Sequence, residues 1–372
     1  MTRVLITGAD GFMGRNLRLM LSERKDVEVT AFTRADPVEA LAGRLEGVDF
    51  IFHFAGINRP ERDEEFAEGN GALTEALCAA VQASGRTIPL LYSSSIQAAR
   101  DNAYGKSKRA AEDALAALRM ATGNPVFTYR LANVFGKWAR PNYNSAVATF
   151  CHNIARGLPI SINDPAAPLA LVYIDDILAE FVAVMDGKEP ESSSDGFALA
   201  GPVYETTVGA VAETIRGFAA TKEDLVIDRV GTGLIRALYA TYVSYLPPAS
   251  FSYNVAMHGD ARGVFVEMLK TPDSGQFSYF TAHPGITRGG HYHHSKTEKF
   301  LVIKGKARFK FRHMDSGETH SIDTDGAVAE IVETVPGWTH DITNIGDDEM
   351  IVMLWANEIF DRDRPDTFAC PL

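Results

Sequence analysis

The residues best suited to carry chemistry form two groups near opposite ends of the sequence. Gly8, Gly11 and Gly14 follow an apolar run and open an amphipathic stretch. In that arrangement, backbone N–H groups and the positive end of a helix can receive a pyrophosphate. Near the other end, His291 and His293 are separated by one residue, so both imidazoles would face the same side of a strand. The first group could bind a dinucleotide, and the second could hold a metal.

A tyrosine and a lysine in the first half could exchange a proton with a substrate. Tyr104 and Lys108 lie one turn apart on the same face of an expected helix. A phenol, with a pKa of about 10, is a poor acid–base at neutral pH unless a neighbouring ammonium favours its anion. Ser94 and Ser95 end the preceding strand and could hold a substrate oxygen, and because successive strand residues face opposite ways, both remain candidates. The alternative is a solvated helix face.

The residues after the second expected strand indicate which dinucleotide would bind. About 20 residues beyond the glycines, NAD enzymes usually place an acid on the ribose hydroxyls. This sequence has Thr33 and Arg34 there, and an arginine favours the 2′-phosphate of NADP, while nearby Asp36 keeps NAD open. We therefore expect NADPH. The expected cofactor-binding residues are Gly8, Gly11, Phe12, Met13, Gly14, Arg34 and Lys108.

The elements that must position these groups change character near residue 245. Before it, apolar runs alternate with helix-like stretches, which predicts an α/β fold with a doubly wound parallel sheet. The runs are residues 3–6, 27–32, 48–54, 88–92 and 127–131, and the helix-like stretches include residues 14–24, 64–84 and 104–122. After Pro247 and Pro248, short strands separated by Gly, Asp and Pro turns predict an all-β jelly roll. We expect two domains, residues 1–245 and 246–372.

Composition excludes several classes of partner. The net charge of −12 and the lack of a long basic block argue against nucleic acid. The three cysteines lie far apart, which suits a reducing compartment. There is no basic-then-apolar leader and no apolar run of about 18 residues, so we expect a cytoplasmic protein without membrane insertion.

The histidine pair belongs to a longer pattern. Gly285-x5-His291-x-His293-x4-Glu298-x6-Gly305 and Pro336-Gly-x2-His340-x3-Asn344 resemble the two motifs of the cupin family, except that the glycine expected shortly before Pro336 is displaced to Gly326. The resemblance implies four metal ligands: His291, His293, Glu298 and His340. These donors suit zinc, nickel, manganese or iron, and we expect zinc. A surface cluster of histidines is the alternative, and a bound metal could be catalytic or structural.

Residues 2–243 resemble the extended short-chain dehydrogenase/reductase family of nucleotide-sugar enzymes. The resemblance is carried by residues 7–14, Tyr104-Gly-Lys-Ser-Lys108 and Tyr173-Ile-Asp175-Asp176. It implies Tyr104 as proton donor, Lys108 as its electrostatic partner and ribose contact, and Ser94 or Ser95 as the third member. It also implies a sugar-nucleotide site that includes Arg130, Asn133 and residues 137–144, for which an ordinary loop is the alternative.

The segment Asp260-Ala-Arg262-Gly263-Val-Phe265-Val-Glu267 resembles part of the deoxysugar epimerases with a cupin-like fold. That resemblance implies that Arg262 contacts a substrate diphosphate, whereas a structural arginine in a turn is the alternative. Candidate proton carriers near the metal are Tyr292, His294 and Lys299, and we expect Lys299 to bind substrate.

Together the halves resemble the bifunctional capsular-polysaccharide enzymes that make the precursor of UDP-N-acetyl-L-fucosamine. The most specific stretches are residues 101–108, 135–138, 270–273 and 290–294. The family implies C3 epimerisation of a UDP-2-acetamido-4-keto-2,6-dideoxyhexose by the cupin domain and NADPH reduction of the C4 ketone by the first domain, giving UDP-2-acetamido-2,6-dideoxy-L-talose. It also suggests a homodimer through the cupin domain. One alternative is a reductase whose metal cupin only binds or dimerises, and another is a metal-dependent oxygenase fused to a reductase.

Overall fold

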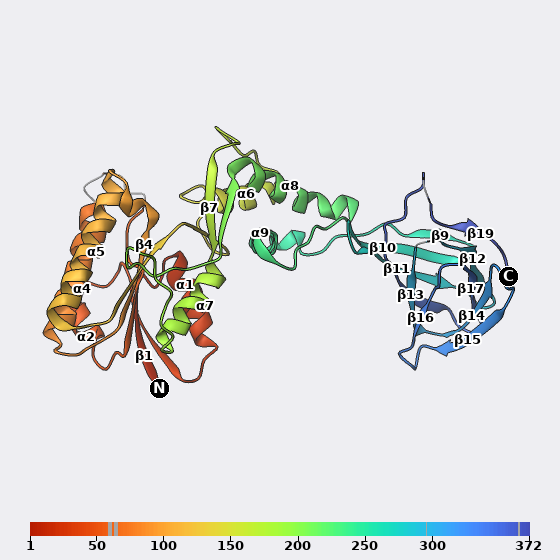
Figure 1. Ribbon diagram of the computed structural model, residues 1–372, viewed down its shortest axis with the longest axis horizontal. Helices are drawn as coiled ribbons and strands as arrows, with labels where there is room; N and C mark the ends of the chain where they lie inside the picture. Colours follow the sequence, from red (N-terminus) through yellow and green to blue (C-terminus); the bar gives the residue numbers. More distant parts are fainter. Residues whose placement is uncertain (59–61, 63–65, 295, 364) are drawn as a thin grey trace. The chain divides into compact units, whose positions relative to one another are not determined.

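The computed structural model describes residues 1–58, 62, 66–294, 296–363 and 365–372. Its contacts divide the chain into two compact units, drawn in Figure 1. The first unit comprises Met1–Ile215 and Arg236–Pro247, and the second comprises Arg216–Ile235 and Pro248–Leu372. The single division at residue 245 stays a prediction.

A parallel five-stranded sheet forms the centre of the first unit, in the order β2-β1-β3-β4-β5. Its strands are β1 (Thr2–Thr7), β2 (Val27–Phe32), β3 (Phe50–His53), β4 (Leu90–Ser95) and β5 (Val126–Leu131). The apolar runs form strands here because both faces are covered, and Leu5, Ile51 and Leu90 are fully buried. Helices α1 (Phe12–Ser22) and α7 (Ile174–Met185) cover one face, and α4 (Leu73–Ala83) and α5 (Ala103–Thr122) cover the other (Figure 1). The predicted doubly wound fold is confirmed.

The segment before α4 differs from the expected helix over residues 64–84. Glu64 lies outside the described residues, and a turn of π-helix, η2 (Ala67–Ala72), precedes α4. Further short elements are η1 (Val38–Ala40), α2 (Leu41–Arg44), η3 (Ile96–Ala99) and η4 (Pro248–Ser250).

A smaller sheet of three strands, β6 (Asn133–Phe135), β7 (Pro168–Tyr173) and β8 (Val203–Thr207), extends the first unit. The remaining helices are α6 (Ala146–Ile154), α8 (Val208–Asp224) and α9 (Gly233–Ser244). No helix within the described ranges is long and apolar enough to cross a membrane.

Two antiparallel sheets build the second unit, in the orders β16-β13-β18-β11-β10-β9 and β15-β14-β17-β12-β19. Along β14, Ala307, Phe309 and Phe311 are buried while the intervening basic residues are exposed, as expected where one face covers a core and the other meets water. The predicted all-β C-terminal region is confirmed. Its strands are β9 (His258–Asp260), β10 (Gly263–Thr271), β11 (Gly275–Ala282), β12 (Thr287–Tyr292), β13 (Glu298–Lys304), β14 (Lys306–His313), β15 (Thr319–Asp325), β16 (Ile331–Glu333), β17 (Trp338–Asn344), β18 (Met350–Ala356) and β19 (Phe368–Ala369).

Candidate active site and metal centre

A cavity of about 550 Å³ opens where the parallel strands end, and the glycine loop forms part of its wall. Gly8 has a φ of +69°, and a Cβ built there would come within 2.7 Å of the Ala55 nitrogen. A Cβ on Gly14 would overlap the Gly8 carbonyl oxygen. Gly11 caps α1 without a side-chain hydrogen bond, which leaves the first N–H groups of the helix for a ligand. Phe12 and Met13 also line the cavity, so the loop residues lie where the sequence predicted.

The two charged residues that follow β2 differ in their surroundings. Arg34 is exposed. The Asp36 carboxylate accepts hydrogen bonds from the Thr33 N–H at 2.8 Å and the Thr33 hydroxyl at 2.9 Å, and it pairs with Arg44 at 2.8 Å. The Thr33 hydrogen bonds, backbone first, and Arg44 lower the pKa of Asp36. The Asp36 carboxylate is therefore already occupied by Thr33 and Arg44.

The tyrosine and lysine lie on one face of α5, at the cavity, as predicted. Lys108 is 6% exposed, and its Nζ donates to the Ser93 carbonyl oxygen at 3.0 Å. Burial lowers the pKa of Lys108 to about 8, and the charge of Glu112 opposes that shift. Burial also raises the pKa of Tyr104, while a side-chain hydrogen bond with Ser95 acts in the opposite direction.

The two candidate serines have different partners. Ser94 is buried, and its hydroxyl donates to Glu112 Oε1 at 2.5 Å. Arg130 holds the same carboxylate through two hydrogen bonds, of 3.0 and 2.6 Å. Ser95 instead bonds to Tyr104. Ser95 therefore lies next to Tyr104, whereas the Ser94 hydroxyl is occupied by Glu112 of α5.

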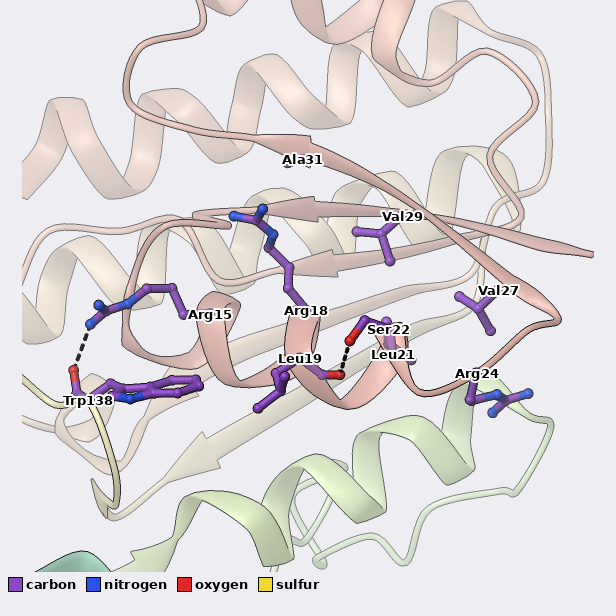
Figure 2. A pocket seen from close by; sticks show the side chains of 10 residues that line it. All are labelled: Arg15, Arg18, Leu19, Leu21, Ser22, Arg24, Val27, Val29, Ala31 and Trp138. Atoms are coloured by element: carbon purple, nitrogen blue, oxygen red, sulfur yellow. Dashed lines mark hydrogen bonds between the residues drawn. The ribbon is translucent and has the colours of Figure 1, made fainter. Parts of the chain in front are cut away.

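The loop after β6 closes one side of this region. Asn133 lines the cavity, and its Nδ2 donates to the Ala170 carbonyl at 3.0 Å, which ties β6 to β7. Arg15 donates to the Trp138 carbonyl at 2.7 Å, so α1 holds the loop in place (Figure 2). Trp138 has a φ of +68°, an uncommon conformation for a bulky residue. Arg15 and Trp138 also line a second cavity, of about 670 Å³, between α1 and edge strand β2 (Figure 2).

The structure gathers the four predicted metal ligands in the second unit. Their nearest ligand atoms all lie within 4.8 Å of one another. His291 and His340 are direct neighbours in the β12–β17 pairing, and Glu298 begins β13. The Nε2 atoms of His293 and His340 lie 3.1 and 3.4 Å from Glu298 Oε2.

The electrostatics of this cluster suit a cation. Burial, and then the neighbouring His340, lower the pKa of His291 to about 4, so its imidazole is neutral at physiological pH. Burial would raise the pKa of Glu298, but the nearby ring nitrogens of His293 and His340 and the charge of Lys296 hold it well below its usual range. Within the described part of the chain, neither ring nitrogen of His340 makes a well-aligned hydrogen bond, although the side chain is buried. Imidazoles beside a buried carboxylate form a fitting donor set for a divalent metal.

The other residues predicted for this site are not gathered with the ligands. Lys299 is exposed and pairs with Glu333, because it follows Glu298 on the strand and faces the opposite side. Arg262 is exposed in the β9–β10 turn, where Asp260 binds its guanidinium. Tyr292 and His294 contact the Phe368 ring, with centroids 5.4 and 4.9 Å apart from it.

One buried residue of the metal region was missed from the sequence. Lys296 is 7% exposed, and its Nζ lies 3.8 Å from Glu298 Oε1. A two-residue spacing from Glu298 could have identified it, since residues i and i+2 share a face in extended backbone.

Comparisons with known proteins agree with this layout. Residues 4–197 match the NAD dependent epimerase/dehydratase family, and residues 258–368 match the polysaccharide biosynthesis C-terminal domain. UDP-2-acetamido-2,6-beta-L-arabino-hexul-4-ose reductase of Pseudomonas aeruginosa is 62% identical over 368 residues, which is 99% of this chain and 98% of that protein. The crystal structure of capsular polysaccharide assembling protein CapF from Staphylococcus aureus has 40% identity and a TM-score of 0.91, covering 99% of this chain and 100% of that one. UDP-glucuronic acid 4-epimerase from Bacillus cereus shares the fold at 16% identity, with a TM-score of 0.55 over 66% of this chain and 98% of that one.

Proposed function

Because the chain belongs to the NAD dependent epimerase/dehydratase family, and along its whole length to the group that includes the Pseudomonas reductase and CapF, we propose that its first unit reduces the C4 ketone of a UDP-linked 2-acetamido-4-keto-2,6-dideoxyhexose. The observation that carries this proposal is the meeting of Tyr104, Lys108 and Ser95 at the cavity of the glycine loop.

Each of these side chains has a role in the proposed reduction. NADPH, when bound, supplies the hydride. Tyr104 donates its phenolic proton to the C4 oxygen, and the Lys108 ammonium stabilises the phenolate that remains. Ser95 donates a hydrogen bond to the same oxygen and so holds the ketone in line.

We propose NADPH as the cofactor, with Gly8, Gly11 and Gly14 leaving room for its pyrophosphate. The exposed Arg34 supplies a charge for the 2′-phosphate, and Asp36, engaged by Thr33 and Arg44, does not compete for the ribose. Arg34→Ala should raise the KM for NADPH while leaving that for NADH unchanged, and Arg24→Ala, remote from the end of β2, serves as the control. Equal effects on both cofactors would argue against this assignment.

For the second unit we propose epimerisation at C3, before reduction. His291, His293, Glu298 and His340 would hold the metal, most simply zinc, which would polarise the ketone oxygen. The C4 ketone acidifies the hydrogen on C3, and reduction removes that ketone, so the epimerisation must come first. The product would be UDP-2-acetamido-2,6-dideoxy-L-talose, on the route to UDP-N-acetyl-L-fucosamine for capsule or O-antigen.

Two residues are proposed to bind the sugar nucleotide. Arg262 of the second unit would contact the diphosphate, and Asn133 would contact the sugar nucleotide in the first unit.

The proposal is tested by incubating the purified protein with the UDP-4-keto-6-deoxy-N-acetylhexosamine and NADPH and determining the product by NMR. The talo configuration supports both steps. Reduction without inversion at C3 would favour the alternative, in which the metal-binding unit only binds or dimerises.

We also propose a cytoplasmic homodimer associated through the second unit, on the strength of the family resemblance. Sedimentation of the full chain and of a variant with charged substitutions on the outer strand β16 tests the dimer. A monomeric wild type would contradict it.

A further inference from the structure

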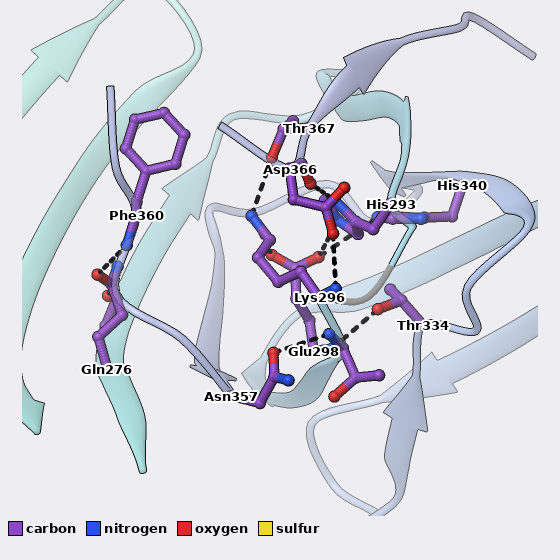
Figure 3. Close-up of polar contacts among 12 residues, drawn as sticks. Gln276, His293, Lys296, Glu298, Thr334, His340, Asn357, Phe360, Asp366 and Thr367 are labelled. Carbon is purple, nitrogen blue, oxygen red and sulfur yellow. Dashed lines mark hydrogen bonds and ion pairs between the residues drawn. The ribbon is translucent and has the colours of Figure 1, made fainter. Parts of the chain in front are cut away.

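The C-terminal segment before β19 lies against residues between β12 and β13, one of which is the proposed ligand His293. Asp366 contacts His293, His294 and Lys296, which lie about 70 positions earlier in the chain. Thr367 contacts Lys296, and Figure 3 shows both C-terminal residues beside His293 and Lys296. The segment then continues into β19, which pairs with β12 through Ala369 and His291. The C-terminal segment therefore contacts two of the proposed ligands, His293 through Asp366 and His291 through Ala369.

The backbone of Asp366 determines how His293 is oriented. The Asp366 carbonyl oxygen lies 2.5 Å from Nδ1 of His293, whose side chain is almost fully buried. A carbonyl can only accept, so Nδ1 must carry a proton and donate. The other nitrogen, Nε2, then faces the cluster, where it lies 3.1 Å from Glu298 Oε2.

The side chain of Asp366 binds two backbone N–H groups that lie between His293 and Glu298 in the sequence. Its two carboxylate oxygens accept the backbone N–H of His294 at 2.9 Å and of Lys296 at 2.8 Å. The hydroxyl of Thr367 accepts from Lys296 Nζ at 3.0 Å, which places that ammonium 3.8 Å from Glu298 Oε1.

We propose that Asp366 is a positioning residue of the metal centre. Its backbone carbonyl fixes the ring of His293 with Nε2 toward the metal, and its carboxylate holds the backbone N–H groups of His294 and Lys296. Partners of this kind set the tautomer and basicity of metal-bound imidazoles, and their loss weakens metal affinity by roughly 10–100-fold. The inference rests on the proposed metal site.

Zinc affinity of the full-length chain tests this role. Zinc is titrated against a chromophoric chelator for wild type, Asp366→Ala and Asp363→Ala, the last an exposed aspartate near the same segment. Asp366→Ala keeps the backbone carbonyl that binds His293 and removes the carboxylate that accepts the N–H groups of His294 and Lys296. We therefore expect Asp366→Ala to bind zinc roughly 10-fold more weakly and Asp363→Ala to match wild type. Unchanged affinity in Asp366→Ala, or an equal loss in the control, overturns the role of Asp366. A wild type that binds no zinc instead refutes the metal site.

The imidazole nitrogens provide a second readout that does not depend on affinity. In ¹⁵N-histidine-labelled, zinc-loaded wild type, His293 should show a protonated Nδ1 and a metal-bound Nε2. The reverse arrangement overturns the inference. If Asp366→Ala fails to fold, Asp366→Asn, which keeps one acceptor oxygen, replaces it, and zinc affinity equal to wild type contradicts the proposal.

Discussion

Lys108 is a buried ammonium whose charge depends on its surroundings. Its side chain is 6% exposed, donates to the Ser93 carbonyl and lies 4.9 Å from the centre of the Tyr92 ring. Burial disfavours the charged form, and Glu112, one turn further along α5, favours it. The proposed reduction by Tyr104 needs that charge, so the protonation of Lys108 should appear in the pH profile.

We expect the rate of reduction to fall as the pH rises through about 8, because Lys108 loses its proton there. Glu112→Gln removes the charge that supports the ammonium, so the alkaline limb of kcat against pH should move to lower pH. The measurement is NADPH oxidation over a pH series with saturating ketone. Glu75→Gln, an exposed acid of α4, is the control, and a limb that does not move in Glu112→Gln would show that Glu112 acts only on structure.

At the scale of elements, the end of β4 provides three successive contacts to α5. The Ser93 carbonyl binds Lys108, Ser94 binds Glu112, and Ser95 binds Tyr104. The alternation of side chains along a strand could be predicted, and it made Ser94 and Ser95 alternatives. Which of them faces the tyrosine could not be predicted, because that depends on how α5 packs on the sheet.

The two serines should therefore respond differently to alanine. Ser95→Ala should lower kcat for reduction by roughly 100-fold, since it removes a donor to the developing oxyanion. It also removes the cap that accepts the Gln97 N–H at the start of η3, which should lower the free energy of unfolding by about 1 kcal/mol. Ser94→Ala should lower the free energy of unfolding by roughly 1–3 kcal/mol, because Glu112 loses a buried donor, with a smaller change in kcat. Denaturant unfolding and NADPH oxidation measure both effects, and the opposite pattern would assign the catalytic role to Ser94.

The same alternation explains the placement of the lysines around Glu298. Once Glu298 faces the cluster, Lys299 must face outward, and Lys296 can face inward. The sequence motifs predicted that His291, His293, Glu298 and His340 are neighbours, and the structure places the four together. Their role as ligands stays a prediction. Lys296 was not found, although its two-residue spacing from Glu298 indicates it. Asp366 could not be found, because its role depends on a contact between distant segments.

At the scale of the molecule, the alternation of apolar runs and helix-like stretches predicted the parallel sheet, and the later turns predicted the antiparallel sheets. Both are confirmed because local pattern and burial agree in each. The turn of π-helix before α4 could not be predicted, since no short-range signal distinguishes it from α-helix.

If epimerisation and reduction use separate centres, as proposed, removing the metal should affect one activity only. Chelation should abolish hydrogen exchange at C3, yet leave reduction of a sugar that has already been epimerised. Zinc should raise the melting temperature of wild type and of the control His320→Ala, which changes an exposed histidine. It should raise the melting temperature of His340→Ala much less, because that variant lacks a proposed ligand. Loss of reduction on chelation would mean that the metal is needed by the first unit as well.

The most direct test of the two-centre account uses Tyr104→Phe, which removes the phenolic hydroxyl but keeps a ring to pack against Phe66, 5.5 Å away between centroids. The variant is incubated in deuterated water with the UDP-4-keto sugar and NADPH, while NADPH oxidation and deuterium at C3 are followed together. We expect oxidation to fall by roughly 100-fold or more and deuterium to enter C3 at the wild-type rate. Loss of both activities together would contradict separate sites for epimerisation and reduction.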